Sequence, residues 1–158
     1  MAFEFRLEKV LKFRRRVMEK HTRDVAVANR VVSAINEKLD SLAEDVDRLL
    51  QDNLMEMNLT LDVGALINRG HWLDHLEALQ DEVEKELETA EQELADQRAL
   101  LTQAWQDLDV LERLREKQKT LWIEEQRKLE NKEMDEIGQI RADRSQREKV
   151  SGLEEQIS

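Results

Sequence analysis

The sequence predicts an all-α protein, a long two-helix antiparallel coiled-coil hairpin whose second helix is longer than the first. Of its 158 residues, 39% are charged and 4% are aromatic, with four Gly and no Pro. A composition so poor in turn formers is typical of long helices and coiled coils. Apolar residues also recur at heptad spacing over two long stretches, as in a helix that buries one face. We expect a single elongated unit over residues 1–158.

The first helix is expected at about 3–57. Positions spaced by seven from Leu11 are apolar at every step, and a companion series starts at Leu7, with Arg14 and His21 as its polar interruptions. The apolar members are Leu11, Met18, Val25, Val32, Leu39 and Val46 in the first series, and Leu7, Ala28, Ile35, Leu42 and Leu49 in the second. Together they form an a/d seam, which faces one partner helix when the pair supercoils left-handedly.

A connection between the helices is expected at about 58–71. The heptad pattern breaks at Asn53 and Glu56, and Gly64 and Gly70 follow within a short distance. Glycine is enriched in turns, so this segment is where the chain is predicted to reverse.

The second helix is expected at about 72–150. Its seam starts with the series from Leu73 and Leu76, and the antiparallel pairing places Leu76 beside Leu49. Beyond about residue 125 the apolar stripe is almost lost, and this part overhangs the first helix. A solitary charged helix is marginal in water, so the overhang is expected to fray unless a partner holds it.

Charge is distributed unevenly around a formal net charge of −11. Residues 1–23 hold eight Lys/Arg against three Asp/Glu, a net charge of +5, whereas residues 74–96 hold one against ten, a net charge of −9. Folding into a hairpin brings both basic ends to one tip and the acidic stretches to the other. The acidic balance argues against nucleic acid as a partner, because phosphate contacts need surplus Lys and Arg.

Several classes of function are excluded by missing residue types. The chain has no Cys, which excludes disulfides, Cys-bound zinc and thiol catalysis. No apolar run approaches the length of a transmembrane helix, and the N-terminus lacks the apolar core of a signal peptide. His71 and His75 have the spacing of a metal pair, but no third ligand is identifiable, so a polar helix face is the preferred interpretation. We expect no enzyme activity, no cofactor, no metal and no small-molecule substrate.

Three tryptophans are candidates for contact with a protein partner. Trp72, Trp105 and Trp122 stand in the second helix, and Trp105 lies one place off the seam. An aromatic side chain there either covers the edge of the seam or marks a binding surface. Both interpretations stay open from the sequence.

Three segments resemble the FliJ family, the small coiled-coil components of the bacterial flagellar export apparatus, which are related to injectisome stalk proteins. Residues 1–16 read MAFEFRLEKVLKFRRR, residues 71–76 read HWLDHL and residues 130–137 read ENKEMDEI. The opening resembles the family's aromatic start and basic run, the second segment its aromatic start to helix 2, and the third its terminal charged motif. The match extends over nearly the whole chain.

The resemblance implies a non-enzymatic stalk in the central pore of the hexameric export ATPase FliI, promoting its assembly or activity. It also implies a link to the export-gate membrane protein FlhA and a role in recycling export chaperones. The chain is then expected to be cytoplasmic, peripheral to the inner-membrane export apparatus, and to meet the membrane only through partners. The implied ATPase-binding set is Phe3, Phe5, Leu7, Arg14, Arg15, Arg16, Arg141, Arg144 and Arg147, and the implied gate-binding set is Leu42, Leu49, Leu76, Leu79 and Val83.

Two other functions fit the residues. One is a generic coiled-coil adaptor or secretion chaperone whose acidic closed end binds basic clients. The other is a peripheral membrane scaffold that uses residues 1–23, because basic residues beside Phe suit an anionic interface.

Overall fold

The computed structural model describes residues 2–57 and 62–157, except for the side chains of residues 53, 56 and 57. By their contacts the residues group into two compact units. Unit 1 joins Met1–Leu11 with Asp109–Ser158, and unit 2 is Lys12–Leu108. The prediction of one elongated unit stays a prediction.

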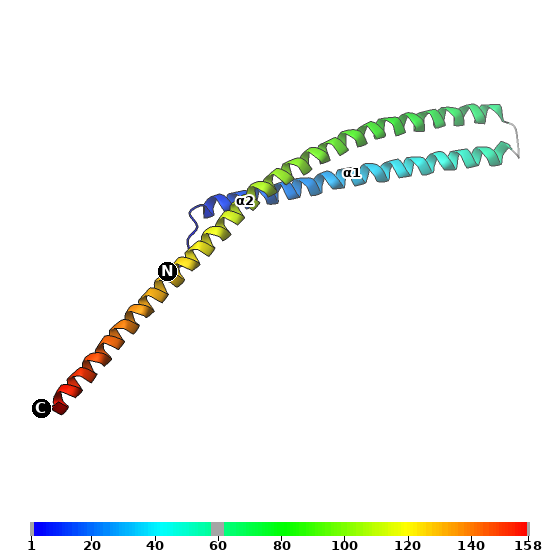
Figure 1. The fold of residues 1–158 in the computed structure, drawn as a ribbon. Coiled ribbons are helices and arrows are strands. Elements are labelled where there is room, and N and C mark those ends of the chain that lie inside the picture. The colour runs from blue at the N-terminus through cyan, green and yellow to red at the C-terminus, as the bar shows by residue number, and fades with distance from the viewer. Residues whose placement is uncertain (1, 58–61, 158) are drawn as a thin grey trace. The chain divides into compact units, whose positions relative to one another are not determined.

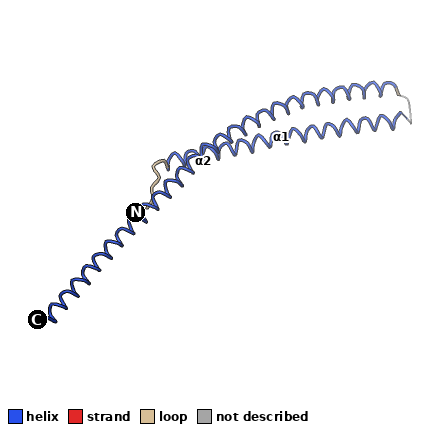
Figure 2. Tube along the Cα trace, in the orientation of Figure 1, coloured by secondary structure: helices blue, strands red, loops and turns tan. Residues whose placement is uncertain are grey.

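Two helices make up nearly all of the described chain. Helix α1 is Glu8–Met57, of 50 residues, and helix α2 is Val63–Ile157, of 95 residues. Within the described residues there is no strand (Figure 2). The predicted all-α class with a longer second helix is therefore confirmed.

In unit 2, α1 and α2 lie antiparallel, side by side (Figure 1). Three polar contacts fix their direction, because the partner's number falls along α2 as the residue number rises along α1. Arg14 lies 3.4 Å from Asp107, Asn29 accepts a hydrogen bond of 3.4 Å from Arg98, and Lys38 lies 3.8 Å from Glu86. These pairs agree, within about one helical turn, with the register predicted from the sequence.

The heptad seam is the core of unit 2. Every seam position from Arg14 to Leu49, and from Leu73 to Leu108, is buried or half-buried, while most positions between them are exposed. The most deeply buried is Val83, at 1% exposure. Since two helices cover a seam only partly, most seam side chains stay half-buried. The coiled-coil hairpin is confirmed, and its stability comes from this single apolar stripe.

The connection is shorter than the predicted 58–71, because α2 begins at Val63. Asp62 caps the helix: its Oδ1 accepts a hydrogen bond of 3.1 Å from the backbone N–H of Gly64, and its carbonyl accepts one from Leu66 at 3.2 Å. The side chain thus satisfies one of the unpaired donors of the first turn. Asp62 therefore marks a helix start within the segment that was predicted to be the turn. Residues 58–61, the rest of that connection, lie outside the described residues.

The predicted break of the heptads at Asn53 and Glu56 falls on side chains outside the described residues. The backbone there is helical, since α1 continues to Met57, where its end was predicted.

Gly70 is a helical residue and not the turn residue that the sequence suggested. No glycine of the described residues has a positive φ, and a Cβ placed on Gly70 or on Gly138 meets no atom within 4 Å. We therefore predict that Gly70→Ala and Gly138→Ala each stabilise the fold, by up to about 1 kcal/mol, the difference in helix propensity between the two residues. Thermal unfolding followed by circular dichroism measures this, and a lower melting temperature for either variant contradicts it.

In unit 1 the N-terminal residues pack against α2 before α1 begins. Phe5 is only 7% exposed, and the ring of Phe3 lies 6.0 Å from that of Trp122. The carbonyl of Phe5 accepts a hydrogen bond from Glu8, the first residue of α1. The predicted start at about residue 3 was therefore too early, because burial of Phe5 holds residues 2–7 out of the helix.

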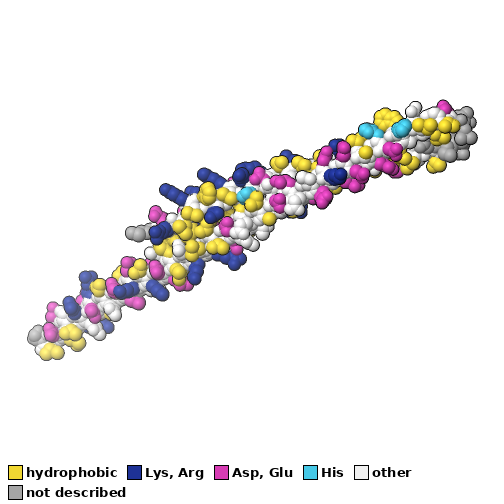
Figure 3. Space-filling view, turned by 90° about the horizontal axis from the view of Figure 1, so that it is seen from above, with side chains coloured by type: hydrophobic (Ala, Val, Ile, Leu, Met, Phe, Trp, Pro, Cys, Tyr) yellow, Lys and Arg dark blue, Asp and Glu magenta, His cyan; other side chains and the backbone are white. Residues whose placement is uncertain are grey.

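The rest of unit 1 has a buried anchor and a long exposed tail. Leu11 has 0% exposure, and the Glu8 carboxylate lies 3.4 Å from Arg115. Residues 127–157, in contrast, are exposed throughout (Figure 3). The structure has them helical to Ile157, beyond the predicted end at about 150. The expected fraying of this part stays a prediction. Strong helix formers such as Glu, Lys, Arg and Gln dominate this stretch, and they favour helix without tertiary contacts.

Candidate functional site

The aromatic start of the chain is used internally. Of the predicted ATPase-binding residues, Phe5 is buried, and Phe3 and Leu7 are half-buried. The ring of Phe3 lies tilted at 52° to that of Trp122, which is itself half-buried. These side chains anchor the N-terminus to α2, and only their outer edges are available to a partner.

The basic run of α1 consists of one arginine on the seam and two exposed arginines. Arg14 occupies a seam position and lies 3.4 Å from the carboxylate of Asp107, so its charge is already paired within unit 2. Arg15 and Arg16 are exposed.

Three further arginines form a ladder in unit 1. Arg141, Arg144 and Arg147 are exposed and stand three residues apart on α2. At this spacing their side chains share one helix face. They belong to a different unit from Arg14–Arg16, so the merging of both basic groups at one tip stays a prediction.

The predicted gate-binding residues are mainly seam residues. Leu42, Leu49 and Leu76 are half-buried and Val83 is buried, all on the seam of unit 2. Leu79 is half-buried beside the seam. Side chains that hold the helices together are poor candidates for direct contact with a partner, which leaves Leu79 as the off-seam member of the set.

An exposed apolar surface near the connection was not singled out as a group from the sequence. It comprises Leu50, Leu54 and Met55 on α1 and Val63, Ile67 and Trp72 on α2, of which Trp72 is 60% exposed. Exposed apolar side chains gathered in one region mark interaction sites. The signal available in the sequence was that all six fall off the heptad seam. Trp105, at 56% exposure, covers the seam edge only in part.

The two histidines after the connection do not make a metal centre by themselves. His71 and His75 are exposed beside Trp72, whose ring lies edge-on to that of His75 at 5.9 Å between centroids. Among residues 2–57 and 62–157 no group of three or more His, Cys, Asp or Glu is placed to bind a metal.

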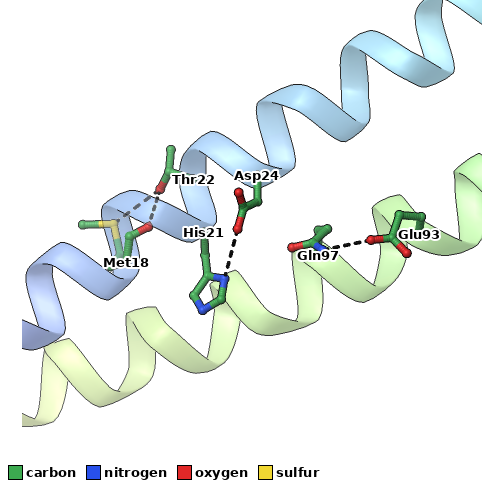
Figure 4. Close-up of polar contacts among 6 residues, drawn as sticks. All are labelled: Met18, His21, Thr22, Asp24, Glu93 and Gln97. Atoms are coloured by element: carbon green, nitrogen blue, oxygen red, sulfur yellow. Dashed lines mark hydrogen bonds and ion pairs between the residues drawn. The ribbon is translucent and has the colours of Figure 1, made fainter.

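A polar layer interrupts the seam of unit 2. Figure 4 shows His21 of α1 pointing toward α2, with Nδ1 3.8 Å from the carboxylate of Asp24, and Gln97 of α2 donating a hydrogen bond of 2.9 Å to Glu93. Nδ1 of His21 and Oε1 of Gln97 are buried without a hydrogen-bond partner. Such unpaired buried polar atoms destabilise a seam.

We predict that His21→Leu stabilises the hairpin, by about 1–2 kcal/mol, because an apolar side chain at this seam position removes a buried nitrogen that has no hydrogen bond. The midpoint of urea unfolding measures the change, with the exposed neighbour Lys20→Leu as the control for added apolar surface. A lower midpoint for His21→Leu shows that the imidazole makes a needed interaction.

Within the described residues, neither helix is sufficiently long and apolar to cross a membrane.

Comparisons with known proteins agree with this architecture. A family model described as the flagellar FliJ protein matches residues 3–147. Among solved structures, a protein of Chlamydia trachomatis described as a YscO homolog aligns with a TM-score of 0.53 and 18% sequence identity, over 88% of this chain and 94% of that chain. At this identity the likeness shows the fold alone. A comparison with curated proteins finds no significant match.

Proposed function

The chain belongs to the flagellar FliJ family, and on that premise we propose that it stands in the central pore of the hexameric export ATPase. Membership confirms the resemblance seen in the sequence. It makes the chain a non-enzymatic coiled-coil stalk protein of the flagellar type III export apparatus.

The main support for the ATPase proposal is the exposed C-terminal part of α2. All of residues 127–157 are exposed, and Arg141, Arg144 and Arg147 form a ladder on one face. A single helix without tertiary contacts gains most when a partner surrounds it. A ring with carboxylates around its pore supplies such an environment, because arginine pairs bidentately with carboxylate.

The basic run of α1 supports this contact directly. The aromatic residues before α1 support it indirectly. Arg15 and Arg16 are exposed, whereas Phe3, Phe5 and Leu7 hold the N-terminus on α2. We assign the arginines to the ATPase surface, and the aromatic residues to keeping that end of the stalk folded.

We place the export-gate contact on Leu79 and Trp72 of unit 2. Both lie off the seam, and Trp72 is 60% exposed. Trp72→Ala is therefore expected to weaken binding to the cytoplasmic part of the gate protein about 30-fold, since truncating a hot-spot tryptophan costs about 2 kcal/mol or more.

Isothermal titration with the purified gate domain tests this prediction. Trp105→Ala is the matched control, because Trp105 is equally exposed on the same helix and lies off the proposed surface. Equal losses for the two variants contradict the placement.

The proposed assembly defines the remaining roles. Bound to the ATPase and the gate, the chain acts at the cytoplasmic side of the inner membrane and reaches the membrane only through these partners. Chaperone recycling is proposed as the third role of the stalk, with export chaperones as the partners.

The direct test is ATP hydrolysis by the cognate export ATPase with and without the chain, together with electron microscopy of the ring. Faster hydrolysis and a filled central pore support the proposal. Unchanged hydrolysis with an empty pore contradicts it.

A second candidate, an adaptor for basic clients, is favoured by one observation. Residues 74–96 carry ten Asp/Glu against one Lys. Binding of a basic export client, with no effect on any ATPase, supports the adaptor. The membrane scaffold is less favoured, because Phe5 is buried against the protein.

A further inference from the structure

Unit 2 carries an apolar groove beside its seam. The groove is lined by Asp24, Val27, Ala28 and Val31 of α1 and by Ala90, Glu93 and Gln97 of α2. Its volume is about 250 Å³, more than the roughly 150 Å³ of an apolar cavity that admits a benzene ring. Val27 and Val31 remain 56% and 47% exposed along its wall. The small side chains of Ala28 and Ala90 open the groove without breaking the seam.

The groove lies on a second apolar stripe of α1. The stripe takes every third or fourth residue: Phe13, Val17, Lys20, Asp24, Val27, Val31 and Ala34. Five of these seven are apolar, and the two charged ones, Lys20 and Asp24, stand together in the middle. A helix with two adjacent heptad stripes is suited to two helical neighbours. Within unit 2, α1 has α2 as its one packed neighbour, so the second stripe is left for another helix.

Charges around the groove select the kind of helix. Asp24 and Glu93 stand on its two walls. The acidic stretch 74–96 of α2 includes the groove residues Ala90 and Glu93 and extends beyond them toward residue 74. On α1, Lys20 lies one turn before Asp24. The occupant should therefore present a carboxylate near Lys20, aliphatic side chains in the groove and cations toward the acidic stretch.

The chain itself contains a helical segment of this description. Met134, Ile137 and Ile140 are 71%, 51% and 62% exposed, and their spacing of three puts them on one face of α2. Seven residues after each of these apolar residues comes an arginine: Arg141, Arg144 and Arg147. The arginines therefore lie on the same helix face. Glu133 precedes the apolar residues. The order acid, apolar, base matches the order of charges along the groove.

We propose that residues 133–147 of a second copy of this chain dock in the groove of unit 2. The α1 wall from Asp24 to Val31 is about 10 Å long, and Met134 to Ile140 spans about 9 Å, so the lengths agree. The docked segment runs parallel to α1, which puts Ile137 against Val27 and Val31. Its arginines then lie over the acidic residues of α2, as arginine–carboxylate contacts require.

Self-association hides the arginine ladder in the copy that donates it. Copies bound to each other in this way therefore compete with any other partner of Arg141, Arg144 and Arg147. The inference does not rest on the proposed function, because it is tested with the chain alone.

Sedimentation equilibrium of the purified full chain is the first test. We expect a concentration-dependent association, and Ile137→Asp to raise its Kd about tenfold or more. Leu153→Asp, an equally exposed residue of the same helix outside the docking segment, should leave the Kd within about twofold. A chain that stays monomeric at the highest concentration, or equal effects of the two variants, overturns the proposal and leaves the groove to a different protein.

Cysteine cross-linking locates the contact, since the natural chain has no Cys. The single variants Val27→Cys and Ile137→Cys, mixed under oxidising conditions, are expected to form a mixed disulfide between copies. Ser33→Cys is the control, because Ser33 is exposed on the opposite face of α1. Cross-linking of Ser33→Cys to Ile137→Cys as fast as that of Val27→Cys shows that the contact lies elsewhere.

Discussion

Removing residues 129–158 is expected to abolish stimulation of the export ATPase while leaving the remaining helices folded. The deleted residues described in the structure, 129–157, are all exposed, so their loss takes no buried side chain from the protein. It does take away Arg141, Arg144 and Arg147. Losing about 3 kcal/mol of charge-assisted contacts corresponds to a loss of about 100-fold in affinity.

The readout is the concentration of stalk that gives half-maximal ATP hydrolysis, with helical content measured by circular dichroism. The full-length triple variant Arg141→Gln, Arg144→Gln and Arg147→Gln is the matched control, because it removes charge without shortening the helix. Loss of stimulation in both variants assigns the effect to the arginines. Full stimulation by the truncated chain contradicts the placement of the ATPase contact on the C-terminal part of α2.

Leu11→Ala is expected to lower the free energy of unfolding by about 2–5 kcal/mol, because Leu11 is completely buried. In a chain of this size the loss corresponds to a melting temperature lower by about 5–15 °C. The cavity opens where unit 1 packs Leu11 and Phe5, the two buried side chains of its N-terminal residues.

Val10→Ala is the control for this prediction. Val10 is the preceding residue and is 41% exposed, so its truncation should cost less than about 1 kcal/mol. Thermal and urea unfolding of the two variants measure the difference. Similar losses for both show that the heptad seam does not set the stability of this end.

The polar interruptions of the seam show how far sequence reasoning reaches. Arg14 and His21 were recognised as exceptions by their heptad positions alone. Only the structure shows that Arg14 is paired with Asp107, whereas Nδ1 of His21 is buried without a hydrogen bond. Partners from the other helix decide this difference, and heptad spacing within one helix holds no information about them.

The candidate binding residues show the same limit. Phe3 and Phe5 were predicted to contact the ATPase, and the structure packs them against α2. Leu42 and Val83 were predicted to contact the gate, and they are seam residues with limited exposure. Residue type identifies a side chain that favours burial, but not whether its own chain or a partner buries it.

The sequence by itself determined the all-α class, the two heptad seams and the antiparallel hairpin, because helical periodicity is a local property that survives without tertiary contacts. Only the tertiary structure decided that Asp62 starts a helix, that Phe5 delays one, and that an apolar groove remains beside Ala28 and Ala90. Each depends on how a side chain meets backbone or another helix. The physical reason is that capping and burial are set by contacts in space, which heptad spacing does not specify.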